Sequence, residues 1–220
     1  MPRTTITRKR FLQTIQLLFW ATITQLNMWF YGDTKRHRRT EYLVPRLKEE
    51  GKIVVIRWGN RNLINALKHK HDTHYDHGNG VTEIIVRIWR SDMGSTIVPI
   101  RFFRGRRIIP DGAFLFGRRL MLLEFCTSDN VHQRLKSKME CYQENLAGVE
   151  EKFQASAFVV FVLDIPREQI SIFLQGRENL DSFFFVDYAT FKSVPIGQQL
   201  KAPIYIWGGD GKEYALSYES

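Results

Sequence analysis

The side chains best placed to do chemistry together are two carboxylates that lie close in the sequence. Asp111 follows Pro110, and twelve residues separate it from Glu124. The apolar segments on either side of a turn near Gly117 predict a hairpin, with Asp111 beginning one strand and Glu124 near the end of the next. Because neighbouring strands lie about 4.8 Å apart, the two carboxylates could share one divalent cation. Oxygen ligands favour Mg²⁺ or Mn²⁺, which can activate water for attack on a phosphodiester.

Three further residues complete this candidate site. Glu83, on a helix expected upstream, offers a third oxygen ligand. Lys138 and Tyr142 are one turn apart on an expected helix and therefore share a face, from which both could approach a scissile phosphate. Taken singly, Asp111 is typical of a turn and Glu124 of a strand end. Their combination, in an expected order of one helix, three strands and a second helix, is what indicates a nuclease-type site.

Basic residues form a second candidate site near the N-terminus. Residues 1–80 contain 15 Lys and Arg against 6 Asp and Glu, whereas residues 81–220 contain 17 of each. A basic segment joined to a neutral one fits a module that binds a polyanion. The alternative is a solvated run of charge that binds nothing. The residues expected to contact double-stranded DNA are Lys35, Arg36, Arg38, Arg39, Arg57 and Arg61.

The elements that must position these basic residues follow the order of a winged helix-turn-helix over residues 1–68. Apolar spacing predicts helices over 7–20 and 23–31, and Asp33 can cap a third helix that ends before Gly51. The basic run 35–39 then opens the third helix, which enters the major groove in this motif, and a hairpin carrying Arg57 and Arg61 forms the wing. Pro45 is expected to kink the third helix. The polar residues 69–80 are expected to form a linker.

Residues 81–220 predict a second domain of the α/β (α+β) class. The expected order is a helix over 81–89, strands over 96–103, 113–117 and 120–126, a helix over 128–145, a strand over 157–165, a helix over 167–175, a strand over 182–188 and a C-terminal hairpin. The run AFVVFVLDI is typical of a central, fully buried strand. Helices and strands in this order favour a mixed sheet flanked by helices, as in restriction-endonuclease-like domains.

These motifs resemble those of two known groups of proteins. PDGAFLFGRRLMLLEFC followed by a helix with Lys-x-x-x-Tyr resembles the PD-(D/E)XK nuclease-like superfamily. The winged helix, the linker, PDG, LLEFCTS, KMECY and the late hairpin, in this order, resemble the replication-relaxation family of plasmids and other mobile elements. The resemblance implies metal carboxylates at Asp111 and Glu124, an auxiliary ligand at Glu83, and a helix motif of Lys138 and Tyr142. It also implies a role in plasmid replication or mobilisation, with relaxase or replication proteins as partners.

One position departs from the superfamily pattern. A lysine two residues after the Glu normally orients the water and stabilises charge, and Cys126 stands in its place. A thiol cannot replace an ammonium in that role, although Lys136 or Lys138 could supply the charge from the helix. Alternatively, the domain has lost its activity and is kept as a platform that binds DNA or forms a dimer.

Three functions are therefore open: a mobile-element protein that recognises an origin-like DNA site, an active Mg²⁺-dependent endonuclease, or a winged-helix repressor. Two cysteines make no disulfide framework, so we expect a cytoplasmic protein, with a homodimer among its expected assemblies. No membrane contact is expected, because the apolar stretch 11–26 is interrupted by polar residues and is typical of a core helix. The histidines between residues 69 and 77 suggest a metal cluster, but a polar linker is the favoured interpretation.

Overall fold

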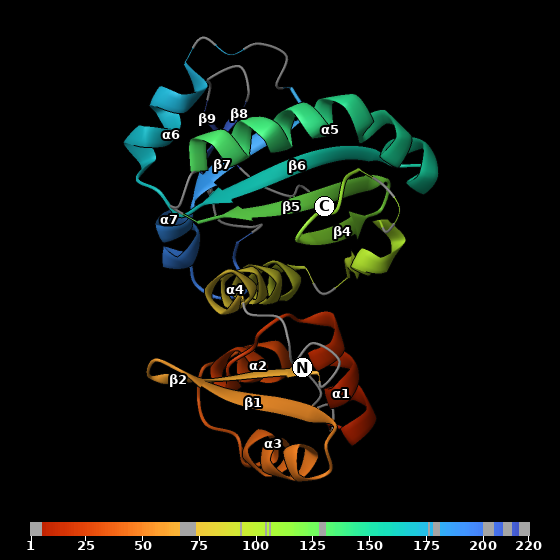
Figure 1. Ribbon diagram of the computed structural model, residues 1–220, viewed down its shortest axis with the longest axis vertical. Helices are drawn as coiled ribbons and strands as arrows, with labels where there is room; N and C mark the ends of the chain where they lie inside the picture. The colour runs from red at the N-terminus through yellow and green to blue at the C-terminus, as the bar shows by residue number, and fades with distance from the viewer. Residues whose placement is uncertain are drawn as a thin grey trace. The chain divides into compact units, whose positions relative to one another are not determined.

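Two compact units make up the chain, Met1–Arg90 and Ser91–Ser220 (Figure 1). This computed structural model describes residues 6–66, 74–92, 94–103, 105, 107–127, 131–175, 177 and 181–199, together with the backbone of two strands over 205–208 and 213–215. Each unit combines helices with strands, so the chain is a mixed α/β protein. Within these ranges, no helix is long and apolar enough to cross a bilayer.

In its described part, the first unit contains four helices and a two-stranded hairpin. The elements are α1 (Arg8–Leu17), α2 (Ile23–Tyr31), α3 (Arg38–Glu49), β1 (Ile53–Trp58), β2 (Arg61–Ala66) and α4 (Tyr75–Ser91). The strands β1 and β2 pair antiparallel. Ala21, between α1 and α2, adds an isolated β-bridge to Ile64 of the hairpin. Three helices followed by a hairpin are therefore present in the expected order.

Capping explains where the first two helices begin. The Thr7 side chain accepts a hydrogen bond from the backbone of Arg10, and Thr22 and Gln25 form a reciprocal capping box at the start of α2. The helix α2 ends at Gly32, whose left-handed backbone (φ +78°) strains other residue types. The helix α1 ends at Leu17 rather than residue 20, because the backbone is already extended at Leu18.

The third helix begins later than the sequence predicted. Asp33 does not cap it, because its carboxylate accepts hydrogen bonds from the backbone of Lys35 (2.9 Å) and from Nε2 of His37 (2.8 Å). His37 is the N-cap residue, and α3 begins at Arg38. Lys35 and Arg36 consequently lie in the loop before the helix and not in its first turn.

Pro45 lies inside α3 and does not end it. The helix continues to Glu49, with Thr40, Leu43, Val44 and Leu47 buried and Pro45 on the exposed side. Proline has no backbone N–H, so the carbonyl of Glu41 loses its usual partner in the helix. On the exposed side of α3, water can satisfy that carbonyl.

The helix α4 begins at Tyr75, so the second half of the expected linker is helical. Gly78 allows α4 to pack closely against Trp20, because a Cβ at this position would lie 3.0 Å from Cδ1 of Trp20. Nδ2 of Asn79 donates to the Trp20 carbonyl (2.9 Å) and to Oε1 of Gln25 (2.8 Å). The Trp29 and Trp89 rings stack with centroids 4.1 Å apart. Apart from its last residue, α4 therefore belongs to the first unit, and the boundary between the units follows Arg90.

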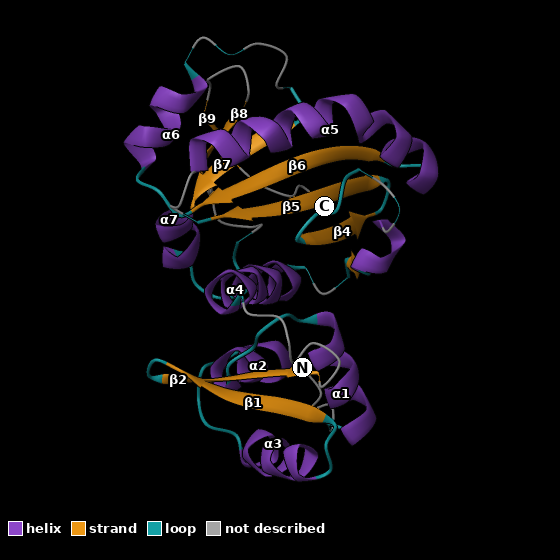
Figure 2. Cartoon of the chain, viewed as in Figure 1, coloured by secondary structure: helices purple, strands orange, loops and turns teal. Residues whose placement is uncertain are grey.

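The described part of the second unit contains a seven-stranded mixed sheet with the order β3-β4-β5-β6-β7-β8-β9. The strands β5, β6 and β7 are parallel, and the remaining neighbours pair antiparallel. The strands are β3 (Thr96–Ile97), β4 (Gly112–Phe116), β5 (Arg119–Cys126), β6 (Ser156–Leu163), β7 (Phe183–Asp187), β8 (Tyr205–Gly208) and β9 (Glu213–Ala215). The helices α5 (Val131–Phe153) and α6 (Arg167–Leu174) connect the parallel strands, and α5 lies along β5 and β6 (Figure 2).

Two elements of this unit differ from the expectation. The predicted strand over 96–103 is only the short β3, followed by a 3₁₀ helix over Ile100–Phe103, because Pro99 lacks the N–H that a continuing strand needs. A short helix, α7 (Tyr188–Ser193), follows β7 and was not expected. Its N-cap is Asp187, whose carboxylate accepts a hydrogen bond from the backbone of Thr190 (2.7 Å).

The core of the second unit lies between one face of the sheet and the helices α5 and α6. Its members include Leu120 and Leu122 of β5, Leu135 and Met139 of α5, and Phe173 of α6. Phe183 and Phe185 of β7 are also buried in this cluster.

Candidate functional sites

Glu124 is a charged group buried in an otherwise apolar face of the sheet. Side chains alternate along β5, so Glu124 points to the same face as Leu122 and Cys126, which is the face covered by α5. Only 2% of Glu124 is exposed. A carboxylate buried to this degree requires partners for its charge and for its hydrogen-bonding capacity.

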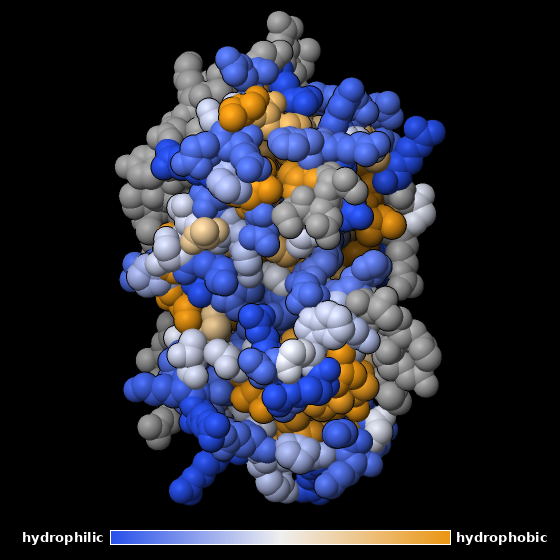
Figure 3. All heavy atoms as spheres, turned by 60° about the vertical axis from the view of Figure 1, so that its left-hand side comes forward, coloured by the Kyte–Doolittle hydropathy of each residue, from blue (hydrophilic) through white to orange (hydrophobic). Residues whose placement is uncertain are grey.

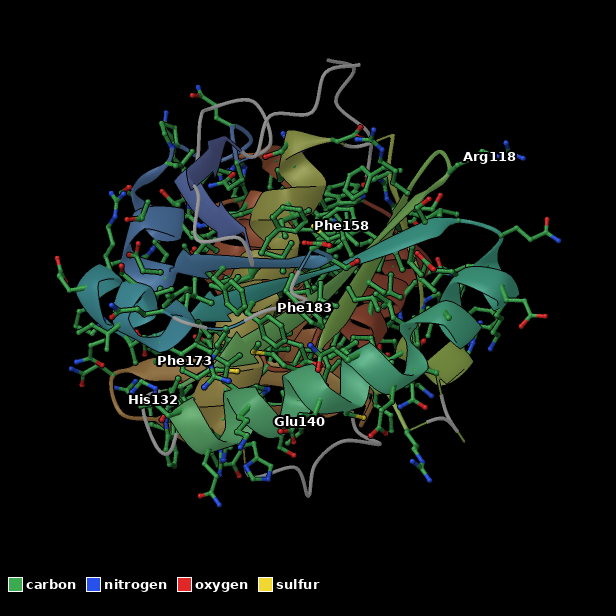
Figure 4. All side chains as sticks on the ribbon, turned by 90° about the horizontal axis from the view of Figure 1, so that it is seen from above. Arg118, His132, Glu140, Phe158, Phe173 and Phe183 are labelled. Atoms are coloured by element: carbon green, nitrogen blue, oxygen red, sulfur yellow. The ribbon has the colours of Figure 1, made fainter. Side chains whose placement is uncertain are left out.

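Two side chains of α5 supply these partners. Oη of Tyr142 donates a hydrogen bond to Oε1 of Glu124 (2.6 Å), and Nζ of Lys138 forms an ion pair with Oε2. Tyr142 is buried, whereas Lys138 is partly exposed at the edge of the helix. Glu140, two residues after Lys138, lies on the outer side of α5 and points away from the sheet (Figure 4).

Asp111 lies beside this pair, directly before β4. Its backbone N–H donates to the carbonyl of Leu123 (2.9 Å), and its Oδ2 accepts a hydrogen bond from the backbone of Phe125 (2.8 Å). These two bonds hold Asp111 against the strand that carries Glu124. The ammonium of Lys138 is 3.9 Å from the same Oδ2. The structure therefore brings Asp111 and Glu124 to the ammonium of Lys138, and the hydroxyl of Tyr142 to Glu124.

The members of the cluster differ in their protonation state at neutral pH. Burial and the neighbouring Asp111 raise the pKa of Glu124 to about 7, although Lys138 and Tyr142 act in the opposite direction. Burial lowers the pKa of Lys138, but the two carboxylates outweigh this effect and raise it overall. Burial, followed by Glu124, raises the pKa of Tyr142 far above its usual range. At neutral pH Lys138 is a cation, Tyr142 is a neutral donor, and Glu124 is near its titration midpoint.

The thiol of Cys126 is unreactive in this environment. Burial raises the pKa of its thiol to about 12, so the thiolate is not formed at neutral pH. The thiol can act neither as a nucleophile nor as a substitute for an ammonium. The nearby positive charge comes instead from Lys138, which lowers the pKa of the Cys126 thiol against the effect of burial.

Glu83, the expected third ligand, is bonded to partners within the first unit. Its carboxylate pairs with Nε of Arg87 (2.7 Å), one turn further along α4, and accepts a hydrogen bond from Nε2 of Gln25 (3.0 Å). Both partners belong to the first unit. Glu83 is therefore part of the polar junction between α2 and α4.

Of the expected metal ligands, Asp111 and Glu124 lie in the second unit. Mg²⁺ is commonly held by one or two carboxylates together with water and substrate phosphate, so the donor types are compatible with it. A divalent ion at this pair would have to share Glu124 with Lys138 and Tyr142. The described parts of the chain contain no group of three His, Cys, Asp or Glu side chains arranged to hold a metal, and His69, His71 and Asp72 lie outside them.

The expected DNA-contacting residues of the α3 region are exposed on the first unit, where long hydrophilic side chains project from the part that carries α3 (Figure 3). The Arg36 side chain is 91% exposed, with its Nε 3.8 Å from Oε1 of Glu41. Arg38 is exposed in the first turn of α3. Nε of Arg39 donates to the carbonyl of Ile6 (3.2 Å), so Arg39 also ties the N-terminal segment to α3.

The two arginines of the hairpin are exposed and oriented by local contacts. Nε of Arg57 donates to the carbonyl of Gly59 in the β1–β2 turn (3.0 Å). Nη1 of Arg61 donates to Oδ1 of Asn79 on α4 (3.3 Å). The hairpin is thus connected to α4 through one of its expected DNA-contacting side chains.

Two exposed residues of α3 were not among the predicted site residues. Tyr42 is 51% exposed, and the guanidinium of Arg46 donates to its hydroxyl. The guanidinium of Arg39 also lies over the Tyr42 ring, 5.8 Å from its centroid. Arg39 lies three residues before Tyr42 and Arg46 lies four residues after it. Residues at these spacings are neighbours on a helix, so the sequence could have indicated this cluster.

No protein-family model, no curated protein and no solved structure matches this chain significantly. The resemblance to the replication-relaxation family therefore rests on the sequence motifs and on their order.

Proposed function

We propose that this chain is a DNA-binding protein of a plasmid or another mobile element, which acts in replication or mobilisation by recognising an origin-like site. The distribution of charge carries this proposal. The first unit, Met1–Arg90, contains 17 Lys and Arg against 7 Asp and Glu, whereas Ser91–Ser220 contains 15 against 16. A positive unit joined to one with almost no net charge fits a protein in which one part binds a polyanion.

The arrangement of the first unit supports a winged-helix mode of binding. Three helices precede the β1–β2 hairpin, and the bridge from Ala21 to Ile64 connects the α1–α2 segment to that hairpin. In this motif the N-terminal part of the recognition helix enters the major groove, which assigns that role to α3. Arg36 and Arg38 are exposed at this end of α3, and Arg57 is exposed on the hairpin, where it can contact the DNA backbone.

A second candidate function is a divalent-metal-dependent DNA endonuclease with a PD-(D/E)XK-like fold in the second unit. The observation that favours it is the cluster of Asp111, Glu124 and Lys138, in which Lys138 offers the cationic charge that Cys126 lacks. A metal ion bound there would activate water for attack on a phosphodiester. Lys138 would hold the scissile phosphate, and the Asp111 side chain would stay fixed by its bond to the Phe125 backbone.

Titration of the full-length chain into fluorescein-labelled duplex DNA tests the main proposal. We expect binding that weakens linearly on a log–log plot of affinity against salt, because bound cations release counterions from the phosphates. Affinity that does not change with salt, or no binding at low salt, would contradict the proposal.

A further inference from the structure

The exposed face of α3 has a well-defined centre. Thr40, Leu43, Val44 and Leu47 are buried, and at 100° per residue they fix the direction of the core. The residues that point most directly away from this core are Arg38, Tyr42, Pro45 and Glu49. Tyr42 stands in the middle of this row, one turn after Arg38.

Tyr42 is unusual among the residues of this face because it is large, aromatic and exposed. Leu17, Tyr42 and Trp58 are the exposed large hydrophobic residues in the described part of the first unit, and Tyr42 is the most exposed of them. Trp58 is engaged elsewhere, since its ring packs against Tyr75 and its Nε1 donates to Asp76 (3.0 Å). Half of Tyr42 is therefore accessible to a partner that approaches this face of α3.

The orientation of the Tyr42 side chain is restrained by its neighbours. Arg46 donates to the hydroxyl oxygen of Tyr42, and this bond uses the oxygen as an acceptor. The hydroxyl hydrogen therefore stays available for donation to another acceptor. The guanidinium groups of Arg39 and Arg46 lie 5.8 Å and 5.7 Å from the ring centroid, so two cation–π contacts restrain the ring.

We propose that Tyr42 reads base identity in the DNA site, and that Arg46 positions it. This inference rests on the proposed function, since it requires α3 to enter the major groove. There, the ring of Tyr42 can contact a thymine methyl group, and its hydroxyl can donate to a purine N7, a guanine O6 or a thymine O4. Arg36 and Arg38, exposed at the N-terminal end of α3, would hold phosphates, which fixes the register without reading sequence.

The test is a selection of bound sequences from a randomised duplex library, carried out with the full-length protein and with Tyr42→Ala. We expect the wild type to enrich a motif, and the variant to lose the preference at one or two of its positions. Replacing the preferred base at such a position should weaken binding of the wild type by roughly tenfold and leave the variant unaffected. Tyr42 is exposed, so the variant is expected to fold, and circular dichroism checks this.

Three further variants separate the roles of charge, ring, hydroxyl and guanidinium. Lys48→Ala, an exposed cation of the same helix, is the matched control and should weaken binding to all sequences equally. Tyr42→Phe separates the contribution of the hydroxyl from that of the ring. If Tyr42→Phe loses the base preference, the preference comes from the hydroxyl. If Tyr42→Phe keeps a preference that Tyr42→Ala has lost, it comes from the ring. Arg46→Lys keeps the charge but not the planar guanidinium, and should reduce the base preference more than the affinity for random DNA.

The outcomes distinguish this inference from the proposed function. If Tyr42→Ala enriches the same motif with the same preferences, Tyr42 does not read bases, while DNA binding stands. If the wild type binds DNA in a salt-dependent manner but enriches no motif, the base-reading role is also overturned. If the wild type does not bind DNA at all, both the inference and the proposed function fail.

Discussion

Tyr142 donates a 2.6 Å hydrogen bond to Oε1 of Glu124, and this bond joins α5 to β5 inside the core of the second unit. The other carboxylate oxygen is held by Lys138. Burying an ion pair is costly, and removing one partner of such a pair leaves a buried charge without compensation. The three residues are therefore energetically linked, and substitutions in the cluster are expected to affect stability as well as any activity.

Replacing Tyr142 by phenylalanine isolates one of these bonds. The ring stays in the core, but Glu124 loses a donor, so we expect the free energy of unfolding to fall by about 1.5–3 kcal/mol, the range for hydrogen bonds to charged groups. Urea denaturation measures this loss. Tyr42→Phe is the matched control, because that ring is exposed and its substitution should change stability by less than about 0.5 kcal/mol. If the two substitutions lower the free energy of unfolding equally, the buried hydrogen bond contributes no more to stability than the exposed hydroxyl of Tyr42.

The pH dependence of stability tests the environment of Glu124. The pKa of an unperturbed glutamate is 4.5 and that of Glu124 in the folded protein is about 7, so between these values the folded state binds a proton that the unfolded state has released. Glu124 therefore makes its largest contribution to stability below pH 4.5, and this contribution is lost as the pH rises through about 7. We expect the stability of the wild type relative to Glu124→Gln to fall by roughly 3 kcal/mol over this window.

Urea denaturation of both proteins at several pH values measures this difference. Glu140→Gln serves as the control, because Glu140 is exposed on the outer side of α5 and pairs only loosely with Lys136 (3.9 Å). A difference between the wild type and Glu124→Gln that stays constant from acidic to mildly alkaline pH would show that Glu124 titrates normally.

Nicking of supercoiled plasmid tests the second candidate function. If the cluster is an active nuclease site, the wild type converts the plasmid to open circles in the presence of Mg²⁺ or Mn²⁺, and Asp111→Ala and Glu124→Ala do not. Lys138→Ala should reduce the rate by at least roughly a hundredfold, as expected for loss of a group that stabilises transition-state charge. Lys136→Ala, an exposed lysine of the same helix, should be active. A wild type that is inactive with both metals would remove the nuclease function and leave the DNA-binding proposal intact.

The double substitution Arg38→Ala/Arg39→Ala tests the role of α3 in contacting phosphates. Each phosphate contact contributes about 0.9 to the slope of log affinity against log salt, so the slope should become shallower by about 2. Fluorescence anisotropy over a range of salt concentrations measures the slope. Arg118→Ala, which removes an exposed charge from the β4–β5 turn of the second unit (Figure 4), should leave it unchanged. An unchanged slope in the double variant would exclude these two arginines from the interface.

Strong periodicity made much of the second unit predictable. The apolar runs of β5 and β6 and the buried face of α5, with Leu135, Met139 and Tyr142, follow directly from the spacing of apolar residues. The same spacing places Lys138 and Tyr142 one turn apart. The sequence could not show that both reach one carboxylate, because the contact with Glu124 depends on how closely α5 packs on β5.

The errors lie where local composition and packing disagree. Residues 75–80 include two glycines, an asparagine and a histidine, which are poor helix formers, yet the contacts of Asn79 with Trp20 and Gln25 stabilise them as the first turns of α4. Aspartate is a common N-cap residue, but the side chain of Asp33 bonds to Lys35 and His37 instead, and the helix begins only after His37. Glu83 and Arg87 have the i,i+4 spacing of a helical ion pair, so the sequence could also have predicted this local partner.

The place of α4 in the first unit constrains how this protein can have been assembled in evolution. A genetic crossover within the codons for residues 69–78, inside the linker that composition alone suggests, would separate Trp29 from Trp89 and Gln25 from Asn79. A crossover after the codons for α4 would keep these pairs intact. Chains that share this first unit but carry a different second part are therefore expected to retain the helix and to diverge beyond Ser91.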